Sequence, residues 1–149
     1  MIEQALEFLR NHVEGVLATV DGDRPCVRAF QIMKQEGSTL YFATSERKEV
    51  YCQLRQNPKV EFLVMHDRVS VRCSGRADFD VADNDKRWIY DHNEVLRRLY
   101  PSYDTMVYFK LPVERMDYYD LRPTPPIHQM FDLTTGVEQE GFVGARFMK

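Results

Sequence analysis

The spacing of apolar residues predicts a helix at the start of the chain, followed by a change to the period of strands. Ile2, Leu6, Leu9 and Val13 recur at helical spacing among polar residues, which predicts an amphipathic helix ending near Gly15. Beyond it, apolar and polar positions alternate, as they do in strands with one buried face.

The first strands form a predicted β-hairpin. Residues 16–20 and 25–33 have strand periodicity, and the Asp-Gly-Asp sequence at residues 21–23 supplies a tight turn between them. A second turn near Gly37 leads into a further strand over residues 39–43. We therefore expect three consecutive strands before the next helix.

That helix is predicted over residues 46–56, and Asn57-Pro58 ends it because the residue before a proline avoids the helical conformation. Residues 59–65 then predict another strand. Residues 69–81 alternate well enough for a long strand, in which Gly75 marks a bend or bulge of the kind that closes a barrel.

The later elements follow the same order. Asp83 and Asn84 can cap a helix that ends before Pro101. Residues 106–111 and 115–121 each predict a strand. The chain is therefore expected to be mainly β with inserted helices.

The 149 residues fit one domain. We expect this domain to span residues 1–121. Residues 122–149 are rich in proline and glycine, which predicts an irregular C-terminal arm packing on the barrel or on a dimer partner. The content of 44% hydrophobic and 29% charged residues is typical of a globular protein.

Charge and hydropathy narrow the range of partners. The net charge of -3 and the pI near 5.8 do not favour nucleic acid or an anionic membrane. The apolar runs are too short to span a bilayer, and the N-terminus lacks a signal-peptide pattern. We expect a cytoplasmic protein that binds neither nucleic acid nor membrane.

The cysteines and histidines are scattered along the chain: Cys26, Cys52, Cys73, His12, His66, His92 and His128. An odd number of cysteines without a C-x-x-C pair supports neither a disulfide framework nor a zinc site, so we expect buried, reduced thiols. The histidines lack a two-ligand spacing on one helix face, and we predict no metal site.

The most informative segment is the transition from strand to helix at residues 40–58. Thr44, Ser45, Arg47 and Lys48 place two hydroxyls and two cations where a helix begins. The N–H groups and positive dipole end of a helix attract anions, so these residues predict a seat for a phosphate. The competing interpretation is ordinary capping by Thr44 or Ser45 with solvated cations.

The order of these elements and several short motifs resembles the pyridoxamine 5'-phosphate oxidase-like family of FMN-binding split barrels. The resemblance covers residues 1–121 and rests on the motifs at residues 15–20, 25–30, 40–44 with Lys48, 53–54 and 57–58. It implies a six- to seven-stranded antiparallel split barrel of Greek-key type with flanking helices. It also implies a homodimer that binds FMN at the subunit interface.

The resemblance assigns roles to particular residues. Thr44, Ser45 and Lys48 correspond to phosphate contacts, with Arg47 as a helper. A phosphate carries about two negative charges and calls for donors and cations at such a site.

The strand with Val27, Arg28, Ala29 and Phe30 corresponds to the one along the flavin ring, and Gln53 to a contact with a flavin carbonyl or ring nitrogen. Arg28 would tune the ring electrostatically. The competing interpretations are a surface ion pair for Arg28 and a surface amide for Gln53.

The implied activity is oxidoreduction, with NADH or NADPH as reductant and a flavin, quinone or nitro compound as the small-molecule electron acceptor. No protein side chain is assigned as catalytic, because the cofactor carries the chemistry. Three alternatives remain open: a deazaflavin-dependent reductase, a non-catalytic flavin or haem carrier or sensor, and a cofactor-free dimeric module. We expect Trp88 to lie in the core, while His66 fits either a turn or the groove.

Overall fold

The computed structural model describes residues 2–141 and begins with a helix and a hairpin. Helix α1 (Ile2–Asn11) leads into β1 (Glu14–Asp21) and β2 (Arg24–Gln31), confirming the predicted hairpin. The helix ends before Gly15, which lies within β1. A Cβ at Gly15 would lie 2.5 Å from the carbonyl oxygen of Leu63, so the close approach of β5 requires glycine there.

The middle of the chain follows the predicted order with shifted ends. It contains β3 (Lys34–Glu36), β4 (Thr39–Thr44), α2 (Glu49–Gln56), β5 (Lys59–His66) and β6 (Val69–Arg76). The strand predicted to reach residue 81 ends at Arg76. Its register shifts between Ser74 and Gly75, which confirms the predicted bulge.

The later elements differ more from the predictions. The single predicted helix is two helices, α3 (Asp83–His92) and α4 (Glu94–Leu99), followed by the short 3-10 helix η1 (Tyr103–Thr105). The two predicted strands form one long strand, β7 (Val107–Asp120).

Pro112 does not interrupt β7, because the strand changes partner there. It pairs with β4 up to Pro112 and with β6 from Val113 onward. The exchange of neighbouring strands along β7 therefore occurs at Pro112.

Residues 122–149 were expected to form an irregular arm. Much of this segment is instead regular: β8 (Ile127–Asp132) pairs with β7, and β9 (Val137–Glu140) pairs with β8. Residues 142–149 lie outside the described residues. The domain boundary at residue 121 stays a prediction.

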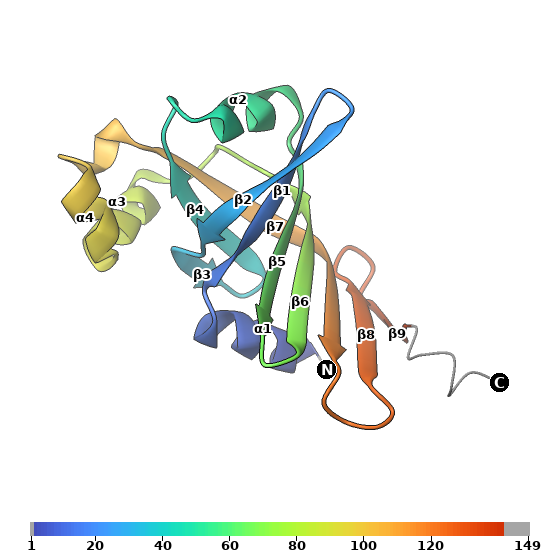
Figure 1. Ribbon diagram of the computed structural model, residues 1–149. Coiled ribbons are helices and arrows are strands. Elements are labelled where there is room, and N and C mark those ends of the chain that lie inside the picture. The colour runs from blue at the N-terminus through green and yellow to red at the C-terminus, as the bar shows by residue number, and fades with distance from the viewer. Residues whose placement is uncertain (1, 142–149) are drawn as a thin grey trace.

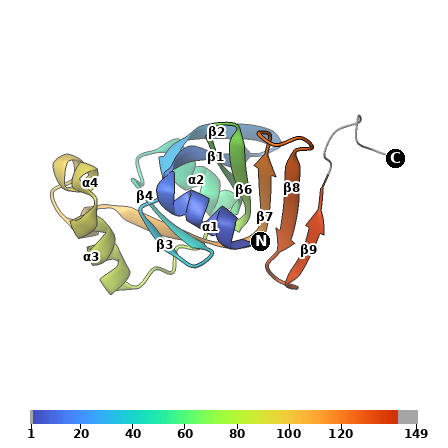
Figure 2. The ribbon, with the colours of Figure 1, turned by 90° about the horizontal axis from the view of Figure 1, so that it is seen from below.

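The strands form an antiparallel sheet in the order β2-β1-β5-β6-β7-β4-β3, with β8 and β9 branching from β7. Figures 1 and 2 show this sheet curled on itself, with α1 at one end, α2 at the other, and α3 and α4 projecting beside β4. The mainly β architecture with flanking helices is confirmed. Within the described residues β2 pairs only with β1, so half of its backbone polar groups face away from the sheet.

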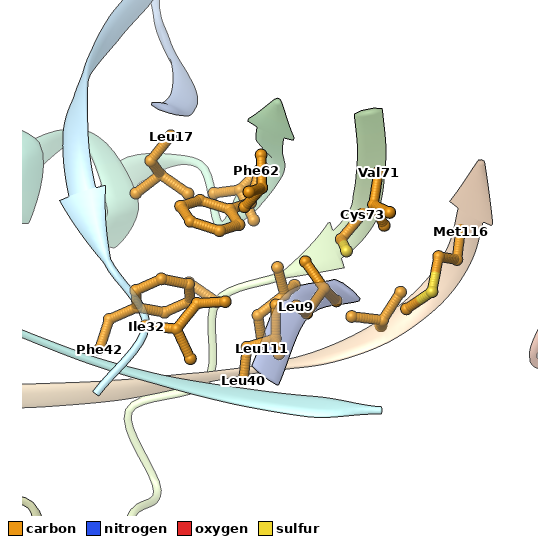
Figure 3. Packing of buried hydrophobic residues seen from close by; sticks show 14 of the residues in the cluster. Leu9, Leu17, Ile32, Leu40, Phe42, Phe62, Val71, Cys73, Leu111 and Met116 are labelled. Atoms are coloured by element: carbon orange, nitrogen blue, oxygen red, sulfur yellow. The ribbon is translucent and has the colours of Figure 1, made fainter. Parts of the chain in front are cut away.

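The core fills the interior of the curled sheet. The rings of Phe42 and Phe62 lie 5.0 Å apart, and those of Phe42 and Phe109 lie 5.2 Å apart. Figure 3 shows Leu9 of α1 and Leu111 of β7 among the side chains that fill the same interior. Because the interior is packed, a ligand must bind outside it.

The three cysteines differ in their burial. Cys73 is buried, and burial raises its pKa to about 12, whereas Cys26 is half-buried and Cys52 exposed. The prediction of buried thiols is therefore wrong for Cys52. Among the described residues, every helix is too short or too polar to cross a membrane.

Candidate functional site

Helix α2 begins later than predicted, and its N-terminus is left without a side-chain cap. The hydroxyl of Ser45 accepts a hydrogen bond from the Arg47 N–H (3.2 Å), and the Lys48 N–H donates to the Ser45 carbonyl (3.1 Å). This turn delays the helix, so that Lys48 takes the cap position and Glu49 is the first helical residue. The end of the helix dipole therefore faces solvent beside two cations.

The side chains around this turn have unused hydrogen-bonding capacity. Arg47 and Lys48 are exposed, and neither side chain makes a hydrogen bond or an ion pair within residues 2–141. Thr44 is only 1% exposed, yet its hydroxyl oxygen has no partner among the described residues. Buried hydroxyls are usually paired, so this one marks a place where a partner is missing.

Arg28 extends from β2 toward α2 and is held by three neutral acceptors. One of its terminal nitrogens, Nη1, donates to the Leu17 carbonyl (3.1 Å) and to the Thr19 hydroxyl (2.7 Å). The other, Nη2, donates to Oε1 of Gln53 (2.6 Å). The Thr19 hydroxyl donates to that same Oε1 (2.6 Å), so β1, β2 and α2 meet at one cluster.

Several of these residues line one pocket, here called the rim pocket, with a volume of about 250 Å³. Arg28, Ala29 and Phe30 of β2 form one side, and Lys48 stands at the α2 end. The pocket therefore lies between the uncapped N-terminus of α2 and the edge strand β2.

Other predicted residues lie near the rim pocket but do not line it. Val27 points to the outer face of β2 and is 67% exposed. Thr44 is the last residue of β4, and Ser45 and Arg47 belong to the turn before α2. Gln53, within α2, is 6% exposed. The amide nitrogen of Gln53 makes no hydrogen bond within residues 2–141, so its predicted contact with a flavin stays a prediction.

Sequence reasoning missed two contributions to the site. Thr19 is a polar residue at an inward position of an otherwise apolar strand, and this was the available signal. The apolar wall of the rim pocket comes from α4 and the residues after it: Val95, Leu96, Leu99, Tyr100 and Met106. Nothing in the spacing of these residues indicates that α4 lines the same pocket as Lys48.

A larger pocket, of about 430 Å³, lies over β1, β5 and β6. Its cations Lys59 and Arg76 share the lining with the carboxylates of Glu61 and Glu114. Because its charges are mixed, it is less suited to a phosphate than the rim pocket.

His66 and Trp88 do not line the rim pocket. His66, at the end of β5, stacks on His12 with ring centroids 4.2 Å apart, near α1 at the opposite end of the barrel from α2. Trp88 is 40% exposed, so its assignment to the core is wrong. It stacks on His92 and lies 5.1 Å from the amino group of Lys34.

Lys34 anchors this outer helix to the sheet. Burial would lower its pKa, but hydrogen bonds to Asp85 (2.5 Å) and Glu36 outweigh that effect and raise the pKa above its usual value. Lys34 is thus a cation with carboxylate partners, unlike Arg28, Arg47 and Lys48.

Comparisons with known proteins give a consistent picture of the fold. The family model described as pyridoxamine 5'-phosphate oxidase matches residues 1–102. No curated protein matches the chain significantly.

Among solved structures, a NimC/NimA family protein from Clostridium acetobutylicum is 26% identical, with a TM-score of 0.74, covering 89% of this chain and 93% of its own. A pyridoxamine 5'-phosphate oxidase-related, FMN-binding protein from Nostoc punctiforme is 16% identical, with a TM-score of 0.72 and coverage of 96% and 95%. A heme-binding protein from Mycobacterium smegmatis is 17% identical, with a TM-score of 0.72, covering 87% of this chain and 57% of its own.

Proposed function

The chain belongs to the pyridoxamine 5'-phosphate oxidase family, and on this premise we propose that it binds FMN at the rim pocket and acts as an FMN-dependent oxidoreductase. The observation that carries the proposal is that Arg28 and Lys48, two cations without carboxylate partners among the described residues, line the same pocket. Unpaired cations at a helix N-terminus suit an anionic ligand.

The residues around α2 fit the phosphate of FMN. Lys48 and Arg47 supply charge, Ser45 stands in the turn, and the Thr44 hydroxyl lacks a partner within the described residues. Charge-assisted hydrogen bonds from such groups are the strong ones. The competing interpretation, that Thr44 or Ser45 simply caps the helix, is weakened because α2 has no side-chain cap.

The residues of β2 fit the ring. An edge strand offers backbone N–H and C=O groups to a flat polar ligand, and Arg28 adds a cation beside them. The wall from α4 offers apolar contact through Leu99 and Tyr100. These residues bind and orient the ring and exclude water from part of its surface.

Bound FMN would supply two-electron redox chemistry, with NADH or NADPH as reductant and a flavin, quinone or nitro compound as acceptor. The chain's contribution is to fix the ring and to set the charge around it. No described side chain is assigned a proton-transfer step.

A second copy of the chain completes the proposed site. The rim pocket is smaller than the roughly 300 Å³ at the lower end of ligand pockets, so one chain encloses only part of FMN. The outer face of β2, β1 and β5 carries a row of outward-facing apolar residues: Val16, Val27, Ala29, Leu63 and Met65. This face, continuous with the edge strand of the pocket, is the proposed homodimer interface.

The absorption spectrum of the purified protein tests the cofactor. The expected result is flavin bands, either as purified or after adding FMN. A colourless protein that does not take up FMN, or one that shows only a Soret band, would contradict the proposal. Anaerobic NADH or NADPH should then bleach the bound FMN faster than free FMN, and an equal rate would leave a binding protein without reductase activity.

The interface is tested by mass determination in solution. Val27→Asp should give a monomer with weakened FMN binding, because a charge in an apolar interface opposes association. Val137→Asp is the matched control, since Val137 is an exposed valine on β9, away from the proposed interface. A monomeric wild-type protein would contradict the dimer.

A further inference from the structure

We propose that Thr19 and Gln53 are positioning residues that hold the guanidinium of Arg28 at the rim pocket as a cation without a counter-ion. This inference rests on the proposed function, because FMN is the ligand that the Arg28 cation would face. Neither Thr19 nor Gln53 lines the rim pocket. Each acts on the pocket through its hydrogen bond to Arg28.

The hydrogen bonds fix both the place and the rotation of the guanidinium. Thr19 holds Nη1 from β1, and Gln53 holds Nη2 from α2, at 2.7 and 2.6 Å. The two residues are 2% and 6% exposed, so water competes little for these bonds. A guanidinium held at both terminal nitrogens from two different elements cannot rotate freely.

The same bonds fix which way Gln53 faces. Its Oε1 accepts from both Thr19 and Arg28, which uses the two lone pairs of an amide oxygen. If the amide were turned around, its NH2 group would face the Arg28 donor. The network is therefore consistent in one orientation only.

All three partners of Arg28 are neutral, which preserves its charge. Arg28 forms no ion pair within residues 2–141, and its acceptors are a carbonyl, a hydroxyl and an amide. A glutamate at position 53 would offer the same acceptor but would cancel the charge. The choice of glutamine keeps a half-buried cation available to an anionic or electron-rich ligand.

Two donors of Arg28 are left over for that ligand. With Nη1 bonded twice and Nη2 once, the Nε–H and one Nη2–H have no acceptor among the described residues. A fixed cation beside a flavin ring stabilises the ring more when it has gained electrons. The clamp therefore predicts that this protein prefers reduced over oxidised FMN through Arg28.

The experiment compares substitutions that separate position from charge. Gln53→Leu and Thr19→Val remove bonds to Arg28, whereas Gln53→Glu keeps the acceptor and cancels the charge. Thr19→Ser keeps the hydroxyl and should behave as wild type. Gln56→Leu, the same change at an exposed position of α2, is the matched control.

The first measurement needs no cofactor. In the FMN-free protein, arginine side-chain NMR should show slowed rotation of the Arg28 guanidinium in wild type, Gln53→Glu, Thr19→Ser and Gln56→Leu. Rotation should be fastest in Gln53→Leu, which frees Nη2. It should rise less in Thr19→Val, because Nη1 there keeps its bond to the Leu17 carbonyl. Fast rotation in the wild type would overturn the clamp while leaving the FMN proposal standing.

The second measurement is the ratio of the affinities for reduced and oxidised FMN, taken from the midpoint potential. Gln53→Leu and Gln53→Glu should each lower this ratio about tenfold, equal to about 30 mV for a two-electron couple. In an Arg28→Met background, Gln53→Leu should change nothing further. A further change there, or an unchanged ratio in Gln53→Glu, would overturn the inference although FMN binding stands.

Failure of the proposed function has a separate signature. If the wild-type protein takes up no FMN, the cofactor proposal fails, and the role of the clamp toward FMN fails with it. The NMR result would then still show whether Thr19 and Gln53 immobilise Arg28.

Discussion

Two charged regions of this protein are built in opposite ways. On β6 and β7, the buried carboxylate of Asp117 accepts from Arg72 (2.5 Å) and Arg115 (3.3 Å), so each of these cations has an anion. At the rim pocket, Arg28 has only neutral partners, and Lys48 has none within residues 2–141.

The difference separates charges that hold the fold from charges that are kept for a ligand. Around Asp117 the opposite charges compensate one another between neighbouring strands, so the region gains nothing from a further ion. At the rim pocket the positive charge is uncompensated, which costs some stability and favours an anion. Substitutions in the first region should therefore affect stability, and those in the second should affect binding.

The largest effect is expected from Asp117→Asn. The buried carboxylate would lose its charge and its charge-assisted hydrogen bonds to Arg72 and Arg115. Because both arginines are about half exposed, the free energy of unfolding should fall by about 2 to 3 kcal/mol at neutral pH. Urea denaturation measures this change. Asp23→Asn, in the exposed turn between β1 and β2, is the control, and FMN affinity should be unchanged in both variants. A loss of FMN affinity without a loss of stability would contradict the assignment of Asp117 to holding the fold.

The next effect concerns binding at the rim pocket. Lys48→Ala should weaken FMN binding by about 2 kcal/mol, the usual contribution of a charge-assisted hydrogen bond. Titration followed by flavin fluorescence measures this affinity. Lys59→Ala, which removes an exposed cation just after α2, should bind FMN as wild type does. Equal FMN affinities in the wild type, Lys48→Ala and Lys59→Ala would show that Lys48 does not contact FMN.

A smaller effect on stability is expected when an arginine of either region is replaced by methionine. Arg28→Met should change the free energy of unfolding by less than about 1 kcal/mol, because losing its hydrogen bonds is offset by removing a half-buried, unpaired charge. Arg72→Met should destabilise more, since the buried carboxylate of Asp117 would lose its shortest ion pair. The two urea midpoints decide this, and the reverse order would contradict the assignment.

The smallest expected effect is a pH dependence of the stability through Asp120, the last residue of β7. Hydrogen bonds from Arg122 hold the pKa of Asp120 below its usual range. Because the pKa is depressed in the folded state, the stabilisation is present above about pH 4, the unfolded value, and is lost as the pH falls through the folded value.

Asp120→Asn should therefore be less stable than wild type at pH 7 by about 1 kcal/mol or less, since Arg122 is half exposed. The gap should close as the pH falls below about 4. Thermal unfolding at several pH values measures it, and a gap that stays constant down to pH 2 would show that Asp120 acts through packing instead.

The sequence predicted most of the sheet because its signals are local. The turn at Gly22, the stop at Pro58 and the bulge at Gly75 each depend on the conformation of a few neighbouring residues. Local signals failed where the structure depends on the partner of a strand, which lies far away in the sequence. Residues 106–111 and 115–121 were predicted as two strands, but one strand continues through Pro112 because its partner changes there.

The candidate site divides in the same way. The cations at Arg47 and Lys48 could be identified from their place between a strand and a helix. Thr19 could not be connected to Arg28 and Gln53, because the three residues belong to β1, β2 and α2 and meet only in the folded chain.

The sequence by itself determined most of the elements up to Arg76, because periodicity and short motifs are properties of neighbouring residues. It also determined the family resemblance, and the match to residues 1–102 confirms that family. Only the tertiary structure decided which charges are compensated. Whether an arginine meets a carboxylate or an amide depends on strand register and helix packing, and these bring together residues such as Arg28 and Gln53 that lie far apart along the chain.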